Sequence, residues 1–473
     1  MAGSESGRFS PEMRIAGRVC CSHIAVVVER ARQRDKRHGC GRLPEPCRAA
    51  VRVGSSGLFA SLATRRAVWK VCGGWRMPLR WDPSDAQTWS ERVAIGGRAM
   101  NPGQRMAQRK CSHIRLADEQ AAASRSNDFD LVSLVRPALP ETRVNQRVLL
   151  TDFFGAPVSA PFFINAMTGG TNEATAINGA LCRVARKTGI AMAFGSADIV
   201  SKDFSRLDGF LQARAENPDG PVLVNVNPTT PVESVRLLVD KLKPVALQIH
   251  VNAVQEAVMP EGDRDFRWMD GIERLRQAMP VPVVVKEVGF GFDVASIGML
   301  AQAGVDAVDV SGEGGTDFAA IENARSLAVG GADFSYLQGI GASTVQSLLN
   351  ARLVAQLMCG RGSTSRMAHG ADEQEATMPI VIASGGVRNP LDVLKCLAMG
   401  ARWVGVSGRF LHVLLSDGEE ALERAIESWK SQLAMLLALY GAKRLSAAAR
   451  IDWTLEPRLE SYLRQMRALC GLE

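Results

Sequence analysis

The 473-residue sequence lacks the long apolar runs of a membrane protein, because none approaches the roughly 18 residues that a transmembrane helix needs. Aromatic residues are also scarce, at 6% of the chain. Apolar residues nevertheless make up 46% and charged residues 22%, a composition that excludes collagenous and wholly disordered chains. The sequence therefore predicts a soluble protein of two or three domains, or one large α/β barrel with additions.

Cysteine pairs with the spacing of a metal or redox site are missing. The ten cysteines form no C-x-x-C motif. The only apolar stretch near the start of the chain, Ile24 to Val28, is too short for the core of a signal peptide. We therefore expect free thiols in a reducing, cytoplasmic compartment.

The positive charge of the chain is confined to its beginning. Residues 1–105 contain 19 Lys and Arg against 8 Asp and Glu, whereas the other 368 residues contain 37 against 41. No nucleic-acid-binding motif accompanies this basic segment, so we expect no nucleic-acid partner.

Residues 1–105 also show no sustained helical or strand period. Three interpretations stay open: a disordered basic tail, a wrongly assigned start, and an Arg-rich transit peptide. The second interpretation is suggested by Met106, which opens the well-patterned segment MAQRKCSHIRLADEQ. We divide the chain into a basic extension of low order, 1–105, and a catalytic domain, 106–473.

From residue 161 onward, short apolar runs alternate with helical stretches. Intervals of about 25–35 residues suit a strand and its return helix, and continuous apolar runs suit strands buried on both faces. Eight such units predict a (β/α)8 TIM barrel. The expected strands are Phe162–Ala166, Ile190–Gly195, Val222–Val226, Ala246–Val251, Val283–Val288, Ala307–Val310, Ile380–Ala383 and Trp403–Val406.

The long interval between the sixth and seventh strands has room for a further helix near Ser343–Leu353 and a polar segment near Gly360–Glu375. After the eighth strand, Ser416–Gly441 is expected to form an amphipathic helix capped by Ser416 or Asp417. We expect its apolar stripe to pack in the core. That stripe is Leu422, Ile426, Trp429, Leu433 and Leu437.

Polar or glycine-rich segments follow every expected strand, where a barrel of this kind builds its active site. After the seventh and eighth strands, the backbone N–H groups around Gly385, Gly386 and Gly408 can bind a phosphate, and Arg388 can add charge. Each loop taken alone is equally well explained as a tight turn. The coincidence of both loops favours a bound cofactor phosphate.

Two further groups of polar residues lie near strand ends. Lys286 interrupts an apolar run and needs an anionic partner, and Glu287 should point to the opposite face, so we expect an anionic flavin beside Lys286. After the fourth strand, Gln255 and Glu256 follow His250 and Asn252 closely. A carboxylate among amides suits Mg2+, with Glu256 as its ligand.

Together these motifs resemble one family, the type 2 isopentenyl-diphosphate isomerases. The resemblance runs from about Gln108 to the last helix and includes RKxxHI, NAMTGG, HVNxxQExxxPEGDRDF, KEVGFG, SGxGGTxFxxIE and ASGGxRxxLD, in this order. It implies a homo-octameric barrel that binds FMN and Mg2+, uses NADPH to reduce the flavin, and interconverts isopentenyl and dimethylallyl diphosphate without net redox change.

The resemblance also implies roles for individual residues. Arg109 and Lys110 would bind the substrate diphosphate, Gln255 would lie against the substrate, and Glu256 would bind Mg2+. The catalytic candidates are Gln255, His250, Asn252 and Lys286. The FMN contacts would be Ala166, Met167, Thr168, Ser196, Asn225, Lys286, Thr316, Gly386, Val387, Arg388, Ser407 and Gly408.

The sequence departs from the family after the second strand, where many members have an arginine for the diphosphate and this chain has Ser196, Ala197 and Asp198. Two alternatives are kept. An FMN-dependent 2-hydroxy-acid dehydrogenase would need a late histidine and arginine pair, and the late histidines are His369 and His412. A non-catalytic flavin-binding barrel is disfavoured by the intact Gln255 and Glu256 pair.

Overall fold

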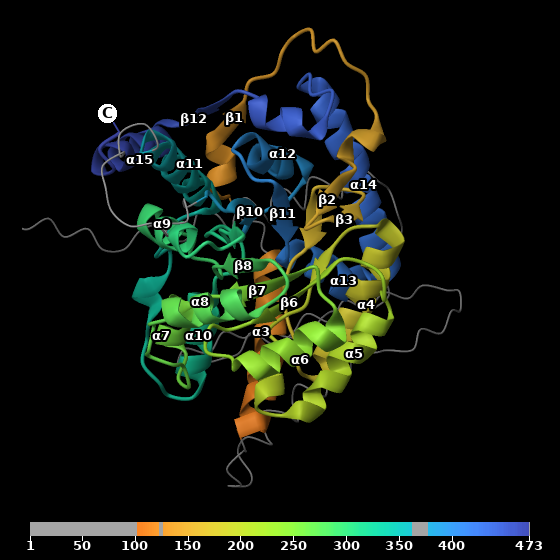
Figure 1. Ribbon diagram of the computed structural model, residues 1–473, viewed down its shortest axis with the longest axis vertical. Coiled ribbons are helices and arrows are strands. Elements are labelled where there is room, and N and C mark those ends of the chain that lie inside the picture. Colours follow the sequence, from red (N-terminus) through yellow and green to blue (C-terminus); the bar gives the residue numbers. More distant parts are fainter. Residues whose placement is uncertain (1–101, 123–125, 362–376, 473) are drawn as a thin grey trace, which may run out of the picture. The chain divides into compact units, whose positions relative to one another are not determined.

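The computed structural model describes residues 102–122, 126–361 and 377–472. In this part of the chain, eight parallel strands close into a barrel in the order β10-β11-β4-β5-β6-β7-β8-β9, which confirms the predicted TIM barrel (Figure 1). The barrel strands are β4 (Phe162–Ile164), β5 (Met192–Ala193), β6 (Val222–Val226), β7 (Ala246–His250), β8 (Val283–Lys286), β9 (Ala307–Asp309), β10 (Ile380–Ser384) and β11 (Trp403–Val406).

The strands form where the sequence has continuous apolar runs, because both of their faces are buried. Every residue of β6 is buried, and the ring closes where Val404 of β11 pairs with Phe162 of β4. Each predicted strand is present, although several end one or two residues earlier than expected. The residues just beyond those ends still donate backbone hydrogen bonds to the neighbouring strand, as Val251 does to the carbonyl of Lys286 over 2.8 Å.

Helices surround the barrel and cover its strands (Figure 1). They are α3 (Pro102–Ala122), α4 (Asn172–Thr188), α5 (Leu207–Ala215), α6 (Val232–Leu242), α7 (Ala253–Val258), α8 (Met269–Ala278), α9 (Val294–Gln302), α10 (Phe318–Ala328), α11 (Thr344–Arg361), α12 (Pro390–Ala398), α13 (Gly408–Asp417), α14 (Glu419–Leu439) and α15 (Pro457–Leu469). None of the described helices is long and apolar enough to cross a membrane.

The expected helix Ser416–Gly441 is α14, which begins at Glu419; Ser416 and Asp417 are the last residues of the preceding helix α13, and Gly418 separates the two helices. Gly418 has φ of 85° and occupies the N-cap position of α14, so the predicted caps, Ser416 and Asp417, are wrong. A positive φ is accessible to glycine at little cost, which allows the chain to turn sharply there. The predicted apolar stripe is buried throughout.

Two short sheets lie outside the barrel. β1 (Val132–Leu134) pairs with β12 (Trp453–Leu455), and β2 (Thr151–Phe153) forms a hairpin with β3 (Ala156–Val158). The hairpin packs at the amino-terminal end of the barrel, where Phe153 contacts Trp403, the first residue of β11. This hairpin therefore covers the end of the barrel opposite to the predicted active site.

The remaining predictions concern the long interval and the extension. The predicted helix near Ser343–Leu353 is α11, and the polar segment near Gly360–Glu375 lies mostly outside the described residues. The predicted low-order extension, 1–105, also lies outside them up to residue 101. Helix α3 begins at Pro102, upstream of Met106.

Candidate active site

The carboxyl-terminal ends of the barrel strands surround a cavity of about 630 Å³. Helix α3 contributes Arg109, Lys110 and His113 to its wall, and α3 contacts α10 and α13. The cavity therefore combines loops at the strand ends with a helix that precedes the barrel in the sequence.

All of the site residues predicted from the sequence line this one cavity. From the barrel and its loops they are Ala166, Met167, Thr168, Ser196, Asn225, His250, Asn252, Gln255, Glu256, Lys286, Thr316, Gly386, Val387, Arg388, Ser407 and Gly408, and from α3 they are Arg109 and Lys110. The closed ring explains this, because residues far apart in the sequence lie at the same end of the strands.

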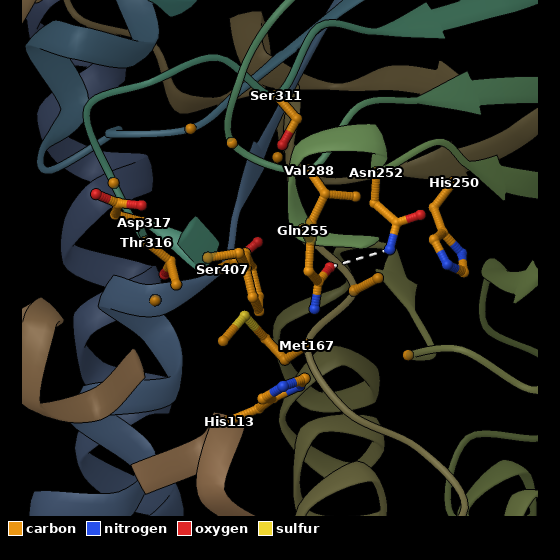
Figure 2. A pocket seen from close by; sticks show the side chains of 18 of the residues that line it. His113, Met167, His250, Asn252, Gln255, Val288, Ser311, Thr316, Asp317 and Ser407 are labelled. Atoms are coloured by element: carbon orange, nitrogen blue, oxygen red, sulfur yellow. Dashed lines mark hydrogen bonds between the residues drawn. The ribbon is translucent and has the colours of Figure 1, made fainter. Parts of the chain in front are cut away.

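Gln255, on the short helix α7, is held between two neighbours. Asn252 Nδ2 donates to Gln255 Oε1 over 3.1 Å, and Gln255 Nε2 donates to Glu322 Oε1 over 3.1 Å. Figure 2 shows Gln255 extending into the same space as Met167 and Ser407. The orientation of its amide is therefore fixed, with one N–H left for a ligand.

Glu322 and His113 were not singled out as site residues, although both lie in motifs of the resemblance. His113 Nε2 lies 2.6 Å from Glu322 Oε1, and Glu322 is completely buried. Burial alone would raise the pKa of Glu322, but the hydrogen bond from His113 and the charge of Arg325 hold it below its ordinary value. Glu322 is therefore an anion that connects α3 to Gln255.

Glu256 follows Gln255 and lies at the edge of the cavity. Its side chain accepts hydrogen bonds from Asn252 Nδ2 over 3.1 Å and from the backbone N–H of Asp263 over 2.8 Å. No group of three or more His, Cys, Asp and Glu side chains suited to a metal occurs within the described ranges. A Mg2+ ion here would take Glu256 as its protein ligand and complete its shell with phosphate and water oxygens.

Lys286, at the end of β8, is buried and has partners within the protein. Its Nζ donates to the carbonyl of Glu287 over 2.6 Å and to Ser311 Oγ over 2.7 Å. Burial lowers the pKa of Lys286, and the nearby carboxylates of Asp309 and Glu287 oppose that effect. The Glu287 side chain turns away, as expected, and accepts from the backbone N–H groups of the following loop.

Two basic residues of α3 form one edge of the cavity. Lys110 Nζ donates to the carbonyl of Ser196 over 3.1 Å, and burial lowers the pKa of Lys110 to about 8. Burial alone would raise the pKa of Asp198, but Lys110 and Ser196 hold it below its ordinary value. Arg109 Nε is buried without a partner among the described residues, so it is available to an anionic ligand.

The glycine loops after β10 and β11 follow neighbouring strands, and both line the cavity. Gly385 and Gly386 have φ of 93° and 71°, and a Cβ on Gly386 would lie 2.7 Å from Gly314. Nearby, Ser407 is the N-cap of α13 and makes no side-chain capping bond. The backbone N–H groups at the start of a helix such as α13 suit a phosphate.

The side chain of Arg388 is occupied by protein partners. Its guanidinium binds Asp130 over 2.7 and 2.9 Å and Asp392 over 2.9 and 3.1 Å. Arg388 therefore fixes the loop after β10 to the segment before the barrel.

The residues present fit FMN. Thr168 Oγ1 is buried in the cavity wall without a partner among the described residues, and a flavin ring can offer it one. The glycine loops and Lys286 line the same cavity, where the loops would hold the phosphate and Lys286 would lie near the ring.

Comparisons with known proteins agree with these features. The family model for FMN-dependent dehydrogenases matches residues 227–453. A lactate oxidase structure from Pediococcus acidilactici is 17% identical, with a TM-score of 0.51 over 76% of this chain and 96% of that one. An arginine-to-lysine variant of flavocytochrome b2 is 18% identical, with a TM-score of 0.50 over 76% and 84%. These two likenesses concern the fold alone.

Closer similarity is found among curated sequences. The isopentenyl-diphosphate delta-isomerase of Streptomyces sp. (strain CL190) is 43% identical over 358 residues, which are 75% of this chain and 92% of the relative. The enzyme of the same name from Limosilactobacillus reuteri (strain DSM 20016) is 40% identical over 365 residues, which are 76% of this chain and 98% of the relative. This identity over nearly the whole length of the relatives confirms the resemblance seen in the motifs, and the chain belongs to the isopentenyl-diphosphate delta-isomerase family.

Proposed function

We propose that the protein interconverts isopentenyl diphosphate and dimethylallyl diphosphate in isoprenoid biosynthesis. The observation that carries this proposal is the convergence of Gln255, Lys286, the basic pair on α3 and the glycine loops on one cavity. The names of the relatives supply the same substrate class.

FMN is the cofactor that we propose for the cavity. Its phosphate would bind the backbone around Gly386 and Gly408, and its ring would lie near Lys286 and Thr168. When bound and reduced, the electron-rich flavin supplies stabilisation of nearby positive charge and a site for a proton. A protonated Lys286 would favour negative charge on a ring bound beside it.

The diphosphate of the substrate would bind Arg109 and Lys110. Both side chains reach the cavity from α3, and the unpartnered Nε of Arg109 offers an additional donor. Glu256 would hold Mg2+ against the diphosphate oxygens, since Mg2+ commonly combines one or two carboxylates with substrate phosphates. These contacts would hold the substrate in the cavity, beside the residues of α7.

Moving the double bond requires protonation of one carbon and removal of a proton from another. Gln255 and Asn252 would orient the alkene, because their amides are fixed by Glu322 and by each other. His250 also lines this side of the cavity. Loss of one positioned group typically lowers the rate of such a proton transfer by about 10²- to 10⁴-fold.

Further properties are proposed from the family resemblance. They are NADPH as the reductant of the flavin, a cytoplasmic location and a homo-octamer. We propose no nucleic-acid or membrane partner.

The alternative of a 2-hydroxy-acid dehydrogenase shares the barrel fold, as the likeness to lactate oxidase shows. Of its two candidate histidines, His369 lies outside the described residues. The other, His412, is held by Asp118 of α3, with Nδ1 2.8 Å from Oδ1. The similarity to the isomerases over nearly their whole length favours isomerisation instead.

The proposal is tested on the purified protein. We expect a yellow protein that NADPH bleaches and that isomerises isopentenyl diphosphate only afterwards. A Gln255→Leu variant should keep the colour and its bleaching but lose at least about 100-fold in kcat. A colourless protein to which added FMN does not bind would contradict the proposal.

A further inference from the structure

A chain of buried amide side chains crosses the interior of the barrel next to the cavity. It begins at Asp309 on β9, whose Oδ2 accepts from Asn165 Nδ2 over 2.7 Å. Gln248 Nε2 donates to Asn165 Oδ1 over 3.3 Å, and Asn225 Nδ2 donates to Gln248 Oε1 over 2.8 Å. The chain ends where Asn225 Oδ1 lies 2.8 Å from Nδ1 of His250.

Asn165 determines the direction of all these hydrogen bonds. The backbone N–H of Ala166 donates to Asn165 Oδ1 over 2.8 Å, and a backbone N–H can only donate. This contact identifies the oxygen of the Asn165 amide, so its nitrogen faces Asp309. Gln248 must then present its nitrogen to Asn165 and its oxygen to Asn225.

The last link of the chain fixes the hydrogen on His250. Because Asn225 Nδ2 is used by Gln248, the oxygen of Asn225 faces the imidazole and must accept from it. We propose that the chain from Asp309 through Asn165, Gln248 and Asn225 holds His250 in the neutral tautomer that carries its hydrogen on Nδ1. Nε2 is thereby a hydrogen-bond acceptor for the occupant of the cavity.

The surroundings of the ring agree with a neutral imidazole. Burial lowers the pKa of His250 to about 4. The charges nearby oppose one another, because Asp198 favours the protonated ring whereas Lys286 and Lys110 disfavour it. A backbone hydrogen bond with Val226 also raises the pKa of His250, but burial outweighs it. The charged groups therefore do not select between the two neutral tautomers, and the amide chain does.

This inference assigns a role within the proposed function and rests on it only for the identity of the ligand. A neutral His250 with a hydrogen on Nδ1 has no proton at Nε2 to give to an alkene. It accepts a hydrogen bond from a donor on the bound ligand, and another group in the cavity must protonate the substrate. Asp309, Asn165 and Gln248 are then positioning residues, since they act through Asn225.

Nitrogen NMR of the full-length holoprotein, labelled with 15N-histidine, tests the tautomer directly. The protein has six histidines, and the His250 signals are assigned by their absence in a His250→Gln variant. At neutral pH we expect the shift of a protonated nitrogen at Nδ1 and of an unprotonated nitrogen at Nε2. A hydrogen on Nε2, alone or together with one on Nδ1, would overturn the inference.

Two variants test whether the chain of amide side chains, and not its surroundings, sets the tautomer of His250. Gln248→Met has a similar length but cannot orient Asn225, so we expect mixed tautomers and a decrease of about tenfold in kcat with KM changed by less than about twofold. Ser384→Ala is the control, because Ser384 Oγ donates to Asp309 over 2.5 Å outside the amide chain, and it should keep the single tautomer. A single tautomer in a folded Gln248→Met variant would overturn the role of the chain.

Asn225→Asp provides a second test should Gln248→Met fail to fold. A carboxylate still accepts from Nδ1, so the tautomer should persist while the pKa of His250 rises above about 4. An unchanged titration of His250 would show that the ring does not depend on residue 225. Because the readout is spectroscopic, the expected tautomer in a protein without isomerase activity would refute the proposed function and leave this inference intact.

Discussion

The two ends of the eight-stranded barrel bury different kinds of side chain. At the amino-terminal end, the β2–β3 hairpin places Phe153 against Trp403 and Phe163, with ring centroids 4.9 and 5.0 Å apart. At the carboxyl-terminal end, the buried residues include the charged Lys286 and the polar Asn252 and Gln255. One end is closed by aromatic packing, whereas the other encloses a polar cavity.

The amino-terminal end of the barrel therefore stabilises the fold, whereas the carboxyl-terminal end lowers its stability. Burying aromatic surface stabilises the fold, whereas burying an ammonium or an amide costs free energy that only hydrogen bonds or a ligand offset. We therefore expect substitutions at the hairpin end to change unfolding and substitutions at the cavity end to change ligand binding.

The largest effect is expected at the hairpin end. Trp403→Ala removes a side chain that is 1% exposed and whose Nε1 donates to the carbonyl of Asp152 over 2.8 Å. We expect a decrease of about 3–5 kcal/mol in the free energy of unfolding, measured by urea denaturation. Trp403→Phe should lose less. Weakened FMN binding in the folded Trp403→Ala protein would contradict the expectation that the hairpin end affects only unfolding.

A smaller but local effect is expected for Gly386→Ala at the cavity end. The added Cβ would meet Gly314 and Asn127 at 2.7 Å in a backbone with positive φ, so the loop must shift. We expect FMN affinity to fall by about 100-fold, or about 2.7 kcal/mol, in a fluorescence titration. Gly330→Ala is the matched control, because Gly330 has φ of 73° and no atom of the described residues lies within 4 Å of an added Cβ. Equal losses in both variants would point to strain alone.

The pH dependence of substrate binding should be set by the cavity end. Burial lowers the pKa of Lys110 to about 8, so Lys110 loses its proton, and the cavity loses a positive charge, as the pH rises through 8. We expect kcat/KM for the diphosphate to fall by about tenfold between pH 7.5 and 9.5, because this ratio reports the free enzyme. Lys110→Arg keeps its charge and should flatten the profile. A profile that falls unchanged in that variant would exclude Lys110.

The smallest effect is expected for an exposed pair at the hairpin end. Arg402 binds Asp152 over 2.6 Å and lies 5.2 Å from the centre of the Trp403 ring, but both charged side chains are about half exposed. Such pairs contribute little, so Arg402→Ala should lower the free energy of unfolding by about 0.5 kcal/mol or less. A loss near that of Trp403→Ala would show that the ion pair, not the aromatic packing, closes this end.

The barrel could be predicted from the sequence because strands that are buried on both faces have continuous apolar sequences. Val222–Val226 has the predicted bounds, and each run is followed by the polar residues that line the cavity. Since the ends of parallel strands meet at one end of a barrel, the location of the site followed once the strands were found.

Hydrogen bonds and ion pairs between residues that lie far apart in the sequence could not be predicted. Asn165, Gln248 and Asp309 look like isolated polar residues near apolar runs until ring closure brings them together. The ion pair of Arg388 with Asp130 could not be predicted, because the two residues lie far apart in the sequence. For Glu322 and His113, membership in quoted motifs was the available signal.

We propose that the protein moves a double bond without net redox change. The most direct measurement counts dimethylallyl diphosphate formed against NADPH consumed, with NADPH present in small excess over enzyme and oxygen excluded. We expect many molecules of product for each NADPH oxidised. One NADPH consumed for each molecule of product, or no product from the reduced protein, would contradict the claim.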